Sequence, residues 1–193
     1  YPPMLVRKYL AAVFIARTLE INGVTGAAMF ANSWIYVAVP ARDELGNKSY
    51  ELSLHHELSS LLFYGGEFPT VRWHLVNEPE FQYLDNQVDI IKAAALSNRK
   101  DPEQAETWHA AGFVSDYGMA SMENDVNTFA ELMMGDPDKL LLLCNEYPKI
   151  AQKKNILIQF YTKLAPEMST YFNRVGLAAN SDRESAPLNS ASN

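Results

Sequence analysis

The segment Leu54-His-His-Glu-Leu-Ser-Ser-Leu-Leu62 decides how this chain folds and where its chemistry lies. Its later leucines follow the first by four, seven and eight residues, which is the spacing of a helix with one buried face. On such a helix His56 and Ser60 share the side opposite the leucines, and Glu57 lies on the flank beside Ser60. We therefore predict an amphipathic helix, closed by Gly65-Gly66, that carries a functional site on its polar face.

The stretch from His56 to Ser60 differs by one residue from a known zinc-binding motif. In His-Glu-x-x-His, two histidines on one helical face bind zinc, and the glutamate polarises the metal-bound water. Here Ser60 holds the second histidine position, and its neutral hydroxyl is a much poorer zinc ligand. His55 lies about 100° from His56, near the leucine stripe. These residues alone leave open a variant zinc-peptidase helix or an ordinary helix with surface histidines, and they favour the second.

The composition is that of one globular domain. The chain has 193 residues, 48% of them hydrophobic, so it is long enough to bury a core. A net charge of -7 at pH 7 argues against a nucleic-acid binder, which normally displays a basic stripe. The single cysteine, Cys144, excludes an internal disulfide and a cysteine-based metal cluster, and its apolar neighbours predict a buried thiol. No segment is long and apolar enough to predict a transmembrane helix.

The part of the chain before the site helix is predicted to contain a helix and a few short strands. Apolar residues at helical spacing predict a helix near 3–17. β-branched and aromatic residues predict strands over 18–22 and 34–39, and 26–32 is predicted to be another strand or a turn. The polar residues 42–49 are predicted to form a loop.

The part after the site helix is predicted to be mainly helical. We predict helices over 85–95, over 102–111, from Ser121 or Asn124 to Gly135, from Pro148 onward, and over 168–175. In the helix that begins at Pro148 we predict that Lys149, Lys153 and Lys154 face solvent. The residues 178–193 are mostly Ser, Asn, Asp and Ala, which is typical of a flexible tail.

Two segments together carry a family resemblance. The first is 50–63, with its His-His-Glu-Leu-Ser-Ser core, and the second is 112–131, which ends in Phe-Ala-Glu. They resemble the site helices of zinc-binding metallopeptidases of the gluzincin type, a clan that includes lethal-factor-like proteins. The opening, 2–39, is similar to the helix-then-strands leader of these proteins. The resemblance implies one α+β domain of zincin-like fold over 1–177, with a small N-terminal strand unit and a mainly helical C-terminal half.

The resemblance assigns roles to individual residues. His56 matches the first zinc ligand and Glu57 matches the general base. Ser60 stands where the second histidine belongs. The third ligand in this clan comes from the second helix, four residues before the glutamate of Phe-Ala-Glu, and that position is Asn127. Glu131 matches the carboxylate that orients a ligand, so two of the three expected ligands are replaced.

Three explanations of these replacements stay open. The metal could be held differently, by His56 with Glu131, if a local distortion recruits His55 or Asp125; adjacent histidines diverge on a regular helix, so this arrangement is strained. The domain could instead keep the zincin fold and bind a polypeptide or another partner without a metal. Finally, the polar side chains of the two helices could simply form a network in a buried cleft, with Ser60 and Asn127 among them.

From the resemblance we expect a zinc-dependent metallopeptidase-like protein. His56 and Glu131 would bind Zn²⁺, and Glu57 would activate the water that hydrolyses a peptide bond. Ser60 argues against ordinary catalysis, so the alternative is a catalytically inactive zincin-like domain that binds a polypeptide or a cell-envelope component. The expected partner is a polypeptide and not a nucleic acid. The chain begins at Tyr1 rather than Met, and its end is rich in Ser and Asn, so we expect an exported protein, in the periplasm, on the cell surface or outside the cell.

Overall fold

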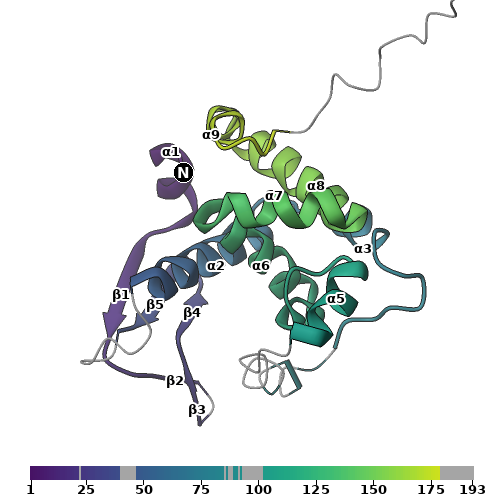
Figure 1. The fold of residues 1–193 in the computed structure, drawn as a ribbon. Helices are drawn as coiled ribbons and strands as arrows, with labels where there is room; N and C mark the ends of the chain where they lie inside the picture. Colours follow the sequence, from purple (N-terminus) through teal and green to yellow (C-terminus); the bar gives the residue numbers. More distant parts are fainter. Residues whose placement is uncertain are drawn as a thin grey trace, which may run out of the picture.

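The computed structural model describes residues 1–21, 23–39, 47–84, 86, 89–90, 92 and 102–178. Within these residues the fold is mixed α+β: small sheets come first and helices make up the C-terminal half (Figure 1). This confirms the predicted class and the helical C-terminal half. Nearly all of the predicted tail, most of the predicted loop at 42–49 and most of the predicted helix at 85–95 lie outside the described residues.

The N-terminal segment is a short helix followed by a strand, α1 (Pro3–Tyr9) and β1 (Ala12–Ala16). The prediction of one helix over 3–17 is therefore wrong beyond Tyr9. Apolar residues continue at helical spacing through this segment, but β1 is rich in β-branched and aromatic residues, which favour a pleated strand. Its pairing with a strand later in the chain outweighs the local periodicity.

The main sheet has three strands in the order β1-β5-β4. The central strand β5 (Trp34–Ala38) pairs in parallel with β1 and antiparallel with β4 (Ala28–Ala31). A separate hairpin joins β2 (Leu19–Ile21) to β3 (Val24–Gly26). The structure confirms the strands predicted over 18–22 and 34–39, and it resolves 26–32 as a strand followed by a turn.

The sheet buries one strand and exposes another. Ile35 and Val37 of the central strand β5 are buried in the core. The outer strand β1, in contrast, exposes Val13, Phe14 and Ile15, and Ile15 is 75% exposed. The sheet therefore ends on this side in an apolar edge strand, whose outer edge pairs with no further strand among the described residues.

The rest of the described chain is mainly helical. In chain order its elements are α2 (Asn47–Gly65), α3 (Thr70–His74), α5 (Pro102–Ala110), the 3₁₀ turn η1 (Asp116–Met119), α6 (Met122–Gly135), α7 (Pro137–Glu146), α8 (Pro148–Leu164) and α9 (Met168–Arg174). The predicted helices that end at Gly135 and begin at Pro148 are confirmed. Ser121 is the N-cap of α6, because its side chain accepts a hydrogen bond from the Asn124 N–H.

Helix α2 is the central element of the domain, packed against the sheet on one side and against α6 on another. Leu58, Leu61 and Leu62 are buried, as predicted, but the intervening Ser59 and Ser60 are buried as well. Leu54, predicted to lie in the buried stripe, is 37% exposed. The helix is therefore buried on more than one face over its second half, because α6 covers the polar face that the sequence predicted to carry the site.

Helix α8 also departs from the prediction. Lys153 is 0% exposed and Lys154 is buried too, whereas both were predicted to lie in solvent. The Lys154 ammonium donates to the carbonyl of Leu177, and Lys153 is paired with the buried carboxylate of Asp125.

Among the described residues, no helix combines the length and the apolar character that crossing a membrane requires.

Candidate functional site

A pocket of about 550 Å³ lies where β4, α2 and the start of α6 meet. Helix α2 contributes His56, Glu57 and Ser60, so three of the polar residues that the sequence singled out share one cavity. The other lining residues come from β4, the end of α2, the residue Ile90, the turn η1 and the start of α6: Ala28, Met29, Phe30, Phe63, Tyr64, Ile90, Tyr117, Ser121, Met122, Glu123 and Asn124. The cavity thus combines aromatic walls with two carboxylates and one imidazole.

His56 is held in place by the second site helix. Its Nδ1 lies 2.6 Å from Oε1 of Glu131, and its ring stacks on Tyr117 with 5.7 Å between centroids. Burial alone would lower the pKa of His56, but the hydrogen bond and charge of Glu131, together with the charges of Glu57 and Glu123, outweigh burial, so the pKa is raised. The bond at Nδ1 leaves Nε2 as the only ring nitrogen that could meet a ligand.

Ser60 and Asn127 contact each other directly. The Asn127 amide donates to the Ser60 hydroxyl, with 2.8 Å between Nδ2 and Oγ, and both side chains are fully buried. In the gluzincin resemblance these are the positions of the second and third zinc ligands. The structure therefore brings the two positions together, with a neutral hydrogen bond between them.

Glu57 lines the pocket and is only 8% exposed. The backbone N–H of Phe30 on β4 donates to its carboxylate. Burial raises the pKa of Glu57 to about 7, His56 opposes the shift, and Glu123 and Glu131 add to it. A carboxyl group with this pKa exchanges its proton near neutral pH, which suits a general acid or base.

The structure does not bring His55 to the pocket. His55 turns toward Glu51, with 3.7 Å between Nε2 and Oε1, and its ring lies 5.7 Å from that of Tyr1. Burial lowers the pKa of His55. On α2 it therefore diverges from His56, as the helical geometry predicts.

The single cysteine, Cys144, is half-buried, and burial raises the pKa of its thiol to about 11.

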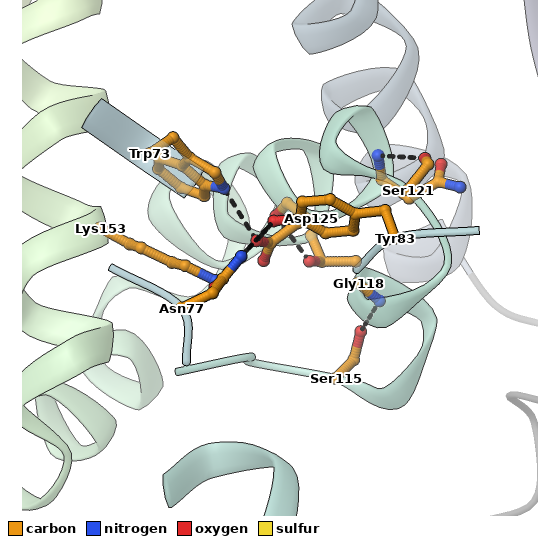
Figure 2. A network of polar contacts seen from close by, with 10 residues as sticks. Trp73, Asn77, Tyr83, Ser115, Gly118, Ser121, Asp125 and Lys153 are labelled. Atoms are coloured by element: carbon orange, nitrogen blue, oxygen red, sulfur yellow. Dashed lines mark hydrogen bonds and ion pairs between the residues drawn. The ribbon is translucent and has the colours of Figure 1, made fainter. Parts of the chain in front are cut away.

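Asp125 also lies outside the pocket, in a separate polar network (Figure 2). Its Oδ2 accepts hydrogen bonds from Trp73 Nε1 at 2.8 Å and from the Tyr83 hydroxyl at 2.7 Å, and it pairs with Lys153 Nζ at 2.7 Å. Asn77 donates in turn to the Tyr83 hydroxyl. The carboxylate suggested as an alternative metal ligand therefore has three partners of its own.

The buried ion pair is stabilised by aromatic rings. Lys153 Nζ lies 3.9 Å from the ring centroid of Phe113 and 5.4 Å from that of Trp73. Burial raises the pKa of Asp125 and lowers that of Lys153, and the attraction between them opposes both shifts. The sequence contains a signal for this lysine, because it lies three residues after Ile150 and four before Leu157, on the buried line of α8.

The donor set at the pocket does not fit a zinc ion. A zinc site normally needs at least three protein ligands that are imidazole, thiolate or carboxylate. Here one imidazole is present, its Glu131 partner is engaged with Nδ1, and the remaining expected positions hold a hydroxyl and an amide. Across the residues that the structure describes, no three His, Cys, Asp or Glu side chains are grouped so that they could hold a metal.

Comparisons of the chain with protein-family models, with curated proteins and with solved structures found no match. The relation to gluzincin metallopeptidases therefore stays a prediction from the sequence.

Proposed function

We propose that this chain is a zincin-like domain in which a hydrogen-bonded polar network replaces the metal site, and that its pocket binds a polypeptide segment. The observation that carries the proposal is the bond between Asn127 and Ser60. The ligands of one metal ion must lie close together in space. Asn127 and Ser60 meet this condition, because their side chains form a direct hydrogen bond. Because both side chains are neutral, the convergence supports the zincin-like architecture and argues against zinc-dependent catalysis.

The position of β4 favours an extended polypeptide as the occupant. This strand lines the pocket, and one of its edges has no partner strand among the described residues. Ala38 N–H donates to the carbonyl of Ala27, so in this antiparallel pair Ala28 and Phe30 direct their backbone groups toward the free edge. Phe30 N–H donates to Glu57, while an added strand could pair with the remaining groups.

The proposal is tested by the binding of a fluorescently labelled unfolded polypeptide, such as reduced and carboxymethylated lactalbumin. We expect saturable binding by fluorescence anisotropy that a chelator does not change, and no cleavage on a gel. Tyr64→Ala, at the pocket, should weaken binding, whereas Leu142→Ala, at an exposed position on α7 that does not line the pocket, should leave it unchanged. Absence of saturable binding would overturn the proposal.

The second candidate is a zinc peptidase with an altered ligand set, in which His56 and Glu131 bind the metal. The observation that favours it is Glu57, whose pKa of about 7 and place beside His56 suit a residue that accepts a proton from water. This candidate predicts hydrolysis of the same polypeptide that a chelator stops and that His56→Ala and Glu57→Gln both abolish. Location outside the cytoplasm stays a prediction.

A further inference from the structure

The pocket carries more negative than positive charge. Glu57 and Glu123 line it, and Glu131 contacts it through His56. None of the lining residues is a lysine or an arginine, and the His56 imidazole is already paired with Glu131. The charges of Glu123 and Glu131 add to the effect of burial in raising the pKa of Glu57. All three carboxylates likewise add to the effect of burial in raising the pKa of the Tyr117 hydroxyl. Among the residues that the structure describes, the pocket therefore has no lysine or arginine that would balance its carboxylates.

Glu57 is the carboxylate that a cationic ligand would stabilise most. It is more than nine-tenths buried, it lines the pocket, and its hydrogen bond comes from the backbone of Phe30. A carboxylate can accept about four hydrogen bonds, so most of its capacity remains for a donor that enters the cavity. A buried carboxylate without a cationic partner is costly, and an ammonium or guanidinium group would offset that cost.

The walls of the pocket suit the rest of such a ligand. Phe30, Phe63, Tyr64 and Tyr117 present aromatic surface to the cavity. Lysine and arginine have an aliphatic stem that packs on apolar surface and a cation that is attracted to the face of an aromatic ring. An uncharged aliphatic side chain would use the walls and leave the Glu57 carboxylate without a partner, and an acidic side chain would be repelled.

We propose that the pocket selects a basic side chain, lysine or arginine, of the bound polypeptide, with Glu57 and Glu123 as the carboxylates that receive its cation. This inference deepens the polypeptide-binding function and depends on it. Tyr64 fixes Glu123 in place, because its hydroxyl donates to Oε2 of Glu123 at 2.9 Å. The two carboxylates thus come from the two helices that meet at the pocket, α2 and α6.

The test uses blocked peptides that differ at one position, which holds lysine, arginine, norleucine or glutamate in an otherwise polyalanine sequence. Binding is followed by chemical-shift changes in the ¹⁵N-labelled protein. Norleucine has the aliphatic stem of lysine without its charge. We expect the lysine and arginine peptides to bind roughly tenfold more tightly than the norleucine peptide, because a charge-assisted hydrogen bond contributes on this scale.

Variants identify the carboxylates. Glu57→Gln and Glu123→Gln should each reduce the preference for lysine over norleucine, while Glu67→Gln, at a 91% exposed side chain outside the pocket, should leave it unchanged. Equal binding of the lysine and norleucine peptides to the unaltered protein would overturn the inference and leave polypeptide binding standing. A preference that persists in both pocket variants would overturn the assignment of the carboxylates. Absence of shifts with every peptide would overturn both the inference and the proposed function.

Discussion

Asn127 on α6 donates a hydrogen bond to Ser60 on α2, with 2.8 Å between the amide nitrogen and the hydroxyl oxygen. Both side chains are fully buried, and each satisfies a polar group of the other. Because an unpaired buried polar group costs about 1–3 kcal/mol, either residue alone would be costly in this position. The two residues therefore form a unit that ties the site helices together, and the pair should be altered together.

Replacing both members of this pair tests the zincin-like arrangement. Ser60→His together with Asn127→Glu supplies an imidazole and a carboxylate beside His56, which completes a conventional set of zinc ligands. We expect this double variant to retain stoichiometric zinc after dialysis, measured by elemental analysis, and the unaltered protein to retain none. Adding His56→Ala should abolish zinc binding. A double variant that folds, as judged by circular dichroism, and takes up no zinc would contradict the proposed relation to zincins.

The buried pair of Asp125 and Lys153 should behave as a coupled unit. Asp125→Asn or Lys153→Met alone leaves one charge buried without its partner, so each should lower the free energy of unfolding by about 3–5 kcal/mol. The double variant should be more stable than either single variant, because neither charge remains. Urea denaturation measures all three. Lys163→Met, which removes an exposed pair with Glu67, is the control and should change stability little. Additive effects at Asp125 and Lys153 would show that the two are not coupled.

Glu57 should make stability depend on pH. Its pKa is raised from an ordinary value of 4.5 to about 7. Between these values the folded state keeps a proton that the unfolded state has lost, so stability falls as pH rises. Glu57→Gln removes this dependence, and the loss of stability between about pH 5 and pH 8 should shrink by up to about 3 kcal/mol. Urea denaturation of the variant and of the unaltered protein at both pH values measures this difference. His56 contributes a fall in the same direction near neutral pH, and the variant keeps the part of it that comes from Glu131 and Glu123.

Ser121 should stabilise the start of α6, and with it the entrance to the pocket. Its hydroxyl accepts a hydrogen bond from the Asn124 N–H at 3.1 Å. Ser121→Ala should lower the free energy of unfolding by about 1 kcal/mol, measured by thermal or urea denaturation. Ser53→Ala inside α2 is the matched control, because that hydroxyl bonds a carbonyl of its own helix and caps nothing. Equal effects of the two substitutions would contradict a capping role.

The local signals in the sequence were sufficient for most helices and for the central strand. Pro148 and Gly135 mark helix ends that the structure confirms, and the β-branched residues of 34–39 predict β5. The strand β1 was missed because its register is set by β5, which lies about twenty residues later, and a short apolar run fits either period.

The site was predicted in part. His56, Glu57 and Ser60 were expected on one helix and do line one pocket. What the sequence could not show is that α6 buries the polar face of α2, because that depends on packing between distant segments. The same limit explains Lys153: its position on the apolar line of α8 was visible, but its partner Asp125 comes from another helix.

The apolar edge of β1 has a consequence for how the protein behaves at high concentration. Edge strands that lack charged residues can pair with the same edge of another molecule, and Val13, Phe14 and Ile15 carry no charge that would oppose this. We expect reversible self-association through this edge, detected as a rise in scattering mass with concentration. Ile15→Lys, at a 75% exposed position, should suppress it without changing the fold, whereas Leu142→Lys on α7 should not. The edge strand β1 would then also limit the solubility of the protein.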